Sequence, residues 1–110
     1  MDESEARSRL LARQAELDEE DRISAEARAP VTLEQDSVGR LSRMDALQVQ
    51  AMALAAEKRR KAERLRIQAA LQRIDQDEWG WCLICGEEIA GTRLEHDPSV
   101  TQCVSCASQR

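Results

Sequence analysis

The chain has 110 residues and its only aromatic side chains are two tryptophans, which is too few for a large aromatic core. Charged residues make up 34% of it, a composition that favours long exposed helices and a small metal-stabilised module. The net charge of −5 disfavours nucleic acid as the main partner, because binding a phosphate backbone requires a concentrated positive surface.

The first predicted element is a helix over residues 3–28. Good helix formers dominate this stretch, and Ile23 is its only β-branched residue. Leu10, Leu17 and Ser24 recur every seven residues and form a thin stripe on one side of the helix. Pro30 ends the helix, since proline disfavours helical geometry in the residue before it.

The second predicted element is a longer helix that begins at Asp36 and ends at Ile74 or Asp75. Its apolar stripe is predicted from side chains at steps of mostly three or four residues: Leu41, Met44, Gln48, Ala51, Ala55, Ala62, Leu65 and Ala69. The two helices are expected to form an antiparallel hairpin with its tip near residues 30–41. Because the second helix is longer, about fourteen of its residues should overhang at the end that leads to Trp79 and Trp81. We expect both tryptophans to lie in the core of the module that follows.

Charge is divided along the chain. Residues 1–36 hold eleven acids and five bases, whereas residues 37–78 hold nine bases and six acids. Two such segments attract each other when they lie side by side. The basic run of residues 58–61 points in four directions on a helix, which favours a solvated stretch. A zinc ribbon that binds nucleic acid through this run remains an alternative.

Four cysteines, Cys82, Cys85, Cys103 and Cys106, form two C-x2-C pairs separated by seventeen residues. This spacing predicts one structural zinc ion, with each pair supplying two corners of a tetrahedron. A catalytic zinc needs an open position, and four thiolates leave none. His96, the only histidine, could replace one thiolate, but we interpret it as an ordinary loop residue. The chain has no nucleophile–histidine grouping and no glycine-rich phosphate loop, so we do not expect an enzyme.

Disulfides or a redox centre are the alternative for these cysteines, and they need an oxidising compartment or a thioredoxin-like context. The sequence opens without the basic and apolar stretches of a signal peptide. The longest uncharged run before the cysteines, residues 46–56, is shorter than the roughly 20 residues of a membrane span. We therefore expect a cytoplasmic protein with no membrane contact.

The cysteine region, residues 79–110, is predicted to be a separate module from the hairpin of residues 1–78. Gly86 directly follows Cys85 and can adopt the positive φ that a tight metal knuckle requires. Ile89, Leu94 and Val100 are the expected apolar positions around the metal. The predicted fold class is all-α, an antiparallel helical hairpin or coiled coil followed by a four-cysteine zinc finger.

The stretch from Trp81 to Cys106 resembles the zinc finger of the DksA/TraR family. It contains C-G-x-x-I after the first cysteine pair, and R-L-E and a proline before the second. Residues 77–81 and 36–41 also resemble that family, so the resemblance covers residues 30–106. Members are bacterial transcription factors that bind RNA polymerase directly, not DNA, by inserting the hairpin into the secondary channel. The resemblance implies the same partner here and no sequence-specific DNA binding. We also expect a monomer.

The resemblance also implies that partner contacts lie at the hairpin tip, at Asp36, Gly39, Arg40 and Leu41. The family pattern there is D-x-x-D-x-A, and this chain has Gly39 in place of the second aspartate and Leu41 in place of the alanine. Glycine carries no charge and destabilises a helical turn by about 1 kcal/mol. An adaptor that binds some other protein through its helices, and is kept folded by zinc, is the alternative function.

Overall fold

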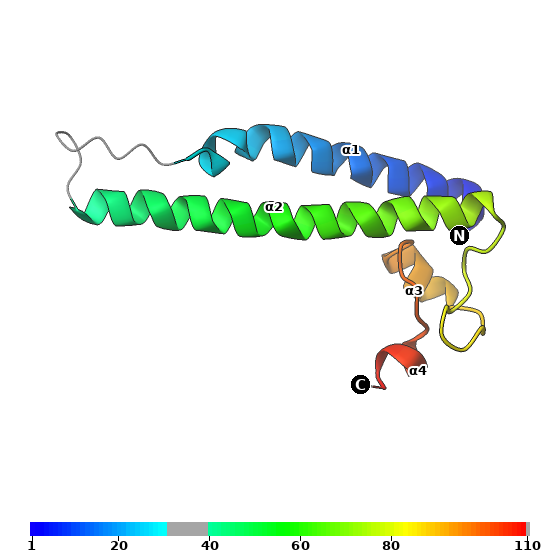
Figure 1. Cartoon of the computed structure of the whole chain (residues 1–110). Coiled ribbons are helices and arrows are strands. Elements are labelled where there is room, and N and C mark those ends of the chain that lie inside the picture. The colour runs from blue at the N-terminus through cyan, green and yellow to red at the C-terminus, as the bar shows by residue number, and fades with distance from the viewer. Residues whose placement is uncertain (31–39, 110) are drawn as a thin grey trace.

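The structure is a computed structural model that describes residues 1–30 and 40–109. Its elements in chain order are α1 (Glu3–Arg28), α2 (Arg40–Asp75), α3 (Gly91–His96) and α4 (Val104–Ala107). Figure 1 shows α1 and α2 side by side and antiparallel, with α3 and α4 in a small module near the C-terminal end of α2. Within the described residues, the one β-type pairing is an isolated bridge between Trp81 and Glu88. The predicted all-α fold class is confirmed.

Both ends of α1 follow from local chemistry. The Asp2 carboxylate caps the first turn by accepting a hydrogen bond from the Glu5 N–H at 2.8 Å. At the other end Ala29 is extended, with ψ 151°, as expected for the residue before Pro30. The predicted bounds of this helix are confirmed.

The C-terminal end of α2 is also where the sequence predicted it. Asp77 has a positive φ of 57°, and the Glu78 N–H donates to the Arg73 carbonyl oxygen at 2.8 Å. This is the hydrogen-bond pattern of a Schellman cap, which satisfies the last carbonyls of a helix. The predicted start at Asp36 lies outside the described residues.

The alignment of the two helices differs from the predicted one. Arg7 pairs with Asp75, and near the other end of α1 the Gln50 side-chain amide donates to the Ala29 carbonyl oxygen at 2.9 Å. Residues 50–75 of α2 therefore run beside α1, and the overhang is the N-terminal part of α2. The expected overhang at the metal end was wrong, because the core and ion pairs at the base set the alignment.

The apolar stripe predicted for α2 was also wrong. The buried residues of the helix are Ile67, Ala70 and Ile74, which are 1%, 0% and 4% exposed. In contrast, the predicted positions Met44 and Leu65 are 59% and 66% exposed. The helix has two stripes with similar spacing. The stripe that packs against α1 offers two β-branched isoleucines, and Arg60 and Arg64 on the same helix reach acids of α1.

One core joins the base of the hairpin to the module. Its buried members are contributed by α1, α2 and the cysteine region: Ala6, Leu10, Leu17, Ile67, Ala70, Ile74, Trp79, Cys82, Ile89 and Leu94. This confirms Leu10 and Leu17 of the stripe predicted for α1, while Ser24 is half-buried. The shared core fixes the module against the hairpin.

The two tryptophans differ in burial. Trp79 is 8% exposed, and its indole N–H donates to the Pro98 carbonyl oxygen at 2.8 Å. Trp81 is 46% exposed, so its predicted place in the core was wrong. Between them Gly80 has a φ of +96°, which breaks the alternation that would put both rings on the same side of an extended chain.

Ion pairs connect the rest of the helix interface. Arg60 and Arg64 donate to the two oxygens of Asp21 at 2.5 and 2.6 Å, so acids of the first segment meet bases of the second as predicted. Within the run of residues 58–61, Arg60 is engaged in this way and the other three are exposed. In residues 1–30 and 40–109, no helix is long and apolar enough to cross a membrane.

Candidate metal centre

The first cysteine knuckle is built by backbone hydrogen bonds around Gly86. The Cys82 N–H donates to the Glu87 carbonyl oxygen at 2.8 Å, and the Gly86 N–H donates to the Cys82 carbonyl oxygen at 3.0 Å. Gly86 has a φ of +77°, which confirms the positive φ predicted from its position. The loop closes tightly enough to direct the Cys82 and Cys85 side chains to the same side.

The second knuckle uses the start of a helix. Cys103 is the N-cap of α4, and its sulfur accepts a hydrogen bond from the Cys106 N–H at 3.4 Å. In the first knuckle the Ile84 N–H donates to the Cys82 sulfur, also at 3.4 Å. Such bonds favour the charged thiolate over the thiol. The two knuckles are joined where the Leu83 N–H donates to the Thr101 carbonyl oxygen at 2.9 Å.

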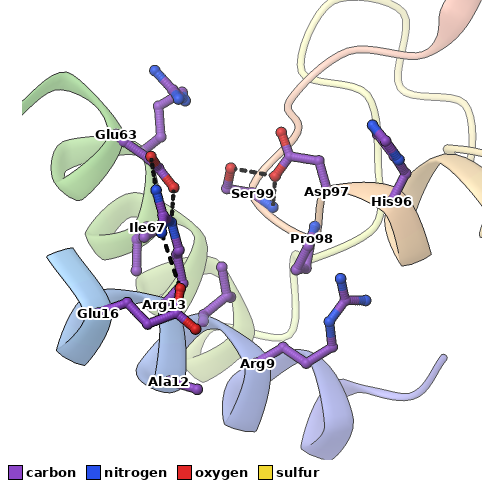
Figure 2. Close-up of a pocket in the computed structure, with 12 residues that line it drawn as sticks. Arg9, Ala12, Arg13, Glu16, Glu63, Ile67, His96, Asp97, Pro98 and Ser99 are labelled. Carbon is purple, nitrogen blue, oxygen red and sulfur yellow. Dashed lines mark hydrogen bonds and ion pairs between the residues drawn. The ribbon is translucent and has the colours of Figure 1, made fainter. Parts of the chain in front are cut away.

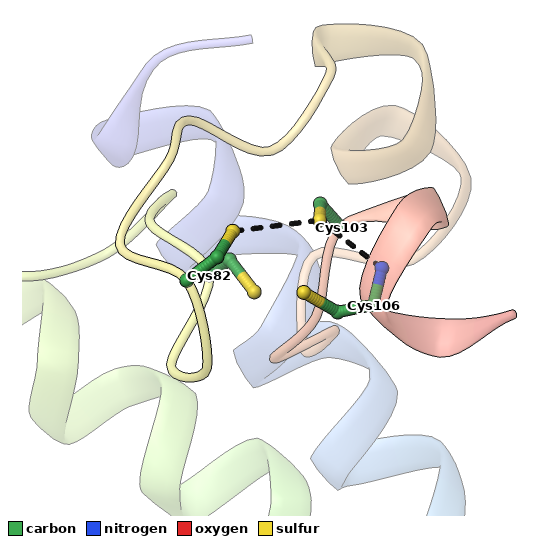
Figure 3. A group of neighbouring side chains, drawn as sticks. Cys82, Cys103 and Cys106 are labelled. Carbon is green, nitrogen blue, oxygen red and sulfur yellow. Dashed lines mark hydrogen bonds between the residues drawn. The ribbon is translucent and has the colours of Figure 1, made fainter. Parts of the chain in front are cut away.

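The four sulfur atoms converge on one point. All four lie within 4.8 Å of one another, and the Cys85 and Cys103 sulfurs are 3.7 Å apart. Zinc–sulfur bonds of about 2.3 Å imply a tetrahedral edge of about 3.8 Å, whereas a disulfide bond is about 2.05 Å long. Figure 3 shows the labelled Cys82, Cys103 and Cys106 around this point. The donor set and its spacing fit a zinc ion.

The electrostatics of the cluster call for a cation. Backbone N–H groups, that of Cys85 first among them, lower the pKa of Cys82 to about 6. The pKa of Cys106 changes in the opposite direction: hydrogen bonding with Cys103 and burial raise it to about 12. Thiolates this close repel one another, and a divalent ion removes that penalty. Four sulfurs are enough to fill the coordination shell of a zinc ion, which gives that ion a structural role.

Residues around the cluster support its two halves. Ile89 and Leu94 are buried and Val100 is half-buried against the core, as predicted. The Arg93 Nε donates to the Gln102 carbonyl oxygen at 2.8 Å, which ties α3 to the residue before Cys103. His96 ends α3, is exposed and lies outside the four-sulfur cluster.

The sequence of the module matches a known family over residues 79–110, the prokaryotic dksA/traR C4-type zinc finger. Those residues include all four clustered cysteines and the buried Trp79. The module is a zinc finger of the dksA/traR C4 type. The resemblance seen in the sequence is thereby confirmed, and so is zinc as the cofactor.

Two other similarities extend this result. The RNA polymerase-binding transcription factor DksA of Haemophilus influenzae is 44% identical over 41 residues, which are 37% of this chain and 28% of that protein. The structure of transcription factor DksA2 from Pseudomonas aeruginosa is similar, with a TM-score of 0.77 and 24% sequence identity. The match covers 97% of this chain and 81% of the DksA2 chain. This chain therefore shares the fold of DksA2 along nearly its whole length, whereas its sequence match spans about a quarter of the Haemophilus protein.

The residues predicted for the tip are described only in part. Asp36 and Gly39 lie outside the described residues, and Arg40 and Leu41 form the first turn of α2, with only their backbone described. Arg40 and Leu41 thus lie at the opposite end of α2 from the cysteine cluster, and α2 is about 54 Å long at the standard rise.

A cleft that no motif in the sequence predicts lies between the hairpin and the module. It has a volume of about 590 Å³ and is lined by α1, α2 and the residues that follow α3. Figure 2 shows Arg13 bound to Glu63 on one wall and Asp97 facing Ser99 on the other. Asp97 accepts hydrogen bonds from the Ser99 N–H and Oγ at 3.0 and 2.7 Å. Three distant segments form this cleft, and no local motif in the sequence indicates that they meet.

Proposed function

We propose that this protein is a transcription regulator that binds bacterial RNA polymerase directly and inserts its helical hairpin into the secondary channel. The observation that carries the proposal is the combination of a DksA/TraR zinc finger with the fold of DksA2 over 97% of the chain. The Haemophilus relative is by its name an RNA polymerase-binding transcription factor.

The four cysteines are the proposed ligands of the zinc ion, which stabilises the base of the hairpin and has no catalytic role. Loss of the ion would release Cys82 from the core that it shares with Trp79 and Ile74. The proposed domains are the hairpin, residues 1–78, and the zinc module, residues 79–110. The shared core transmits the orientation of one to the other, so the module can act as the stop that sets how far the hairpin enters the channel.

The proposed contacts with polymerase are Asp36, Gly39, Arg40 and Leu41. The overhang of α2 supports this assignment, because the N-terminal part of α2 extends beyond the end of α1 toward the tip. With Gly39 in place of the family aspartate, one carboxylate is missing from the tip. We therefore expect binding of the usual kind and an altered effect on the polymerase active site.

Competition for core RNA polymerase tests the proposal. Zinc-loaded protein should displace a known secondary-channel factor, and Asp36→Ala and Leu41→Asp should weaken this displacement. Asp45→Ala is the matched control, because it removes the same charge from α2 at a position outside the proposed tip. Binding that ignores the competitor, or tip variants indistinguishable from the control, would contradict insertion into the channel.

The alternative is a zinc-stabilised adaptor for another protein, with the hairpin as its binding surface. It is favoured by large apolar side chains that α2 leaves in solvent, among them Met44, Met52 and Leu65. An adaptor predicts that tip variants have no effect on function and that the protein does not displace a channel factor. The same competition assay therefore separates the two proposals.

A further inference from the structure

The face of α2 that points away from α1 carries a second heptad-like stripe. We call it the outer seam and define it by its residues: Met44, Leu47, Ala51, Leu54, Lys58, Ala62, Leu65 and Ala69. Successive members are three or four residues apart, as in the contact stripe of a coiled coil. At about 100° per residue, all of them lie within roughly 40° of the direction opposite the buried Ile67. The helix can thus contact α1 and a further helix at once.

Among the described residues, every member of the outer seam is exposed to solvent. Its four large apolar members, Met44, Leu47, Leu54 and Leu65, are between 45% and 66% exposed. The alanines between them are exposed too, and a surface hollow of about 530 Å³ lies along Leu65 and Ala69. Small residues beside large ones give the knob-and-hole relief that fits another helix.

Charge is sorted around α2 in a way that selects the partner. Its four acids, Asp45, Glu57, Glu63 and Asp75, all lie within about 80° of the direction of Ile67, and three of them pair with arginines of α1. The outer side holds bases instead: Lys58 lies within the outer seam, and the partly or fully exposed Arg43 and Lys61 flank it. No acid of the described part of α2 lies on that side.

We propose that the outer seam is a docking site for an acidic amphipathic helix of a partner protein. Apolar residues of that helix would fill the hollow along Leu65 and Ala69, and its flanking carboxylates would face Lys58, Lys61 and Arg43. A second copy docked seam to seam would juxtapose bases with bases. A narrow stripe of this kind also differs from the broad apolar face of helices that lie on membranes. The site does not include the proposed tip contacts, Asp36, Gly39, Arg40 and Leu41, and a docked helix would compete with insertion of the hairpin into the channel.

A designed peptide provides the probe. It has about 21 residues, three heptads, with Leu at the contact positions and Glu at the flanking ones, and is compared with the same peptide carrying Lys in place of Glu. Fluorescence anisotropy with the full-length zinc-loaded protein should detect binding of the Glu peptide only, weakening as salt increases. Equal binding of the two peptides, or binding of neither, would overturn the proposal.

Two matched variants locate the binding. Leu65→Glu lies on the outer seam and should weaken binding about tenfold or more, because a buried leucine anchor is replaced by a repelling charge. Met52→Glu is the control, since Met52 and Leu65 are 65% and 66% exposed but Met52 lies outside the outer seam. Circular dichroism verifies that both variants fold. Equal effects of the two substitutions would contradict the proposed site.

Competing occupants are tested with the same variants. Light scattering should give the mass of one chain; a dimer that Leu65→Glu converts to monomer would instead assign the outer seam to a second copy. Flotation with vesicles of phosphatidylcholine and phosphatidylserine should leave the protein unbound; binding that is lost in Leu65→Glu would assign it to a membrane surface. Either result would overturn the acidic helix as the occupant.

Discussion

Arg13 of α1 and Glu63 of α2 form a two-point ion pair across the hairpin. The Arg13 Nε is 2.7 Å from one carboxylate oxygen of Glu63, and its Nη2 is 3.0 Å from the other. This geometry fixes both the distance and the rotation of the two helices. The arginine side chain is 38% exposed, so we expect a modest energetic contribution, of the order found for surface pairs.

The acid sensitivity of the hairpin follows from this pair. The hydrogen bond from Arg13 holds the pKa of Glu63 below its ordinary value. The pair therefore stabilises the fold at pH values above the unfolded pKa of about 4.3. This contribution is lost as the pH falls through the lower pKa of the folded state. Glu63→Gln should lower the free energy of unfolding, measured by urea titration, near neutral pH. Below about pH 4 this free energy should fall less steeply in the variant than in the wild type. Glu26→Gln is the control, because Glu26 has no ion pair within the described residues. An unchanged acid profile in Glu63→Gln would contradict this role.

Removal of the zinc ion should unfold the module before the hairpin. In Cys103→Ser we expect no bound zinc, rapid proteolysis within residues 79–110 and most of the helical circular dichroism retained, because that segment has too few apolar side chains to fold alone. Ser105→Ala, in the same knuckle, should behave as wild type. A mutant whose metal-free module resists protease as well as the metal-bound form would refute the structural role of zinc.

Gly86 should be required for its backbone conformation alone. A Cβ at either Gly86 or Gly91 would meet no atom within 4 Å, but only Gly86 of the two has a positive φ. Gly86→Ala should therefore cost about 1–2 kcal/mol, equivalent to roughly tenfold weaker zinc retention in competition with a chelator. Gly91→Ala should retain zinc like wild type. Equal zinc loss in the two variants would show that space, and not φ, matters there.

The choice between the two stripes of α2 can be tested by paired truncations. Ile67→Ala removes a side chain that is 1% exposed and should lower the free energy of unfolding by about 2–5 kcal/mol. Leu65→Ala removes a larger exposed area and should change it by less than about 0.5 kcal/mol. Urea titration measures both, and comparable losses would mean that the outer seam is packed in solution.

The local features of the fold could be predicted from the sequence. Capping chemistry at Asp2 and the break at Pro30 determine α1, and the run of helix formers ends where Asp77 turns the chain. The spacing of the cysteines was sufficient to predict a zinc ion with a closed coordination shell, because two C-x2-C knuckles supply the four thiolates of a tetrahedral site. The positive φ of Gly86 followed from its position after Cys85.

Only the tertiary structure decided which side of each element faces the core. Two stripes of α2 have similar spacing and similar apolar content, and the selection of Ile67 over Leu65 depends on partners in α1 that are distant in sequence. The burial of Trp79 and the exposure of Trp81 depend likewise on one turn at Gly80 and on the carbonyl of Pro98. Periodicity specifies that a helix has a face, but the contacts that decide between equivalent faces come from other parts of the chain.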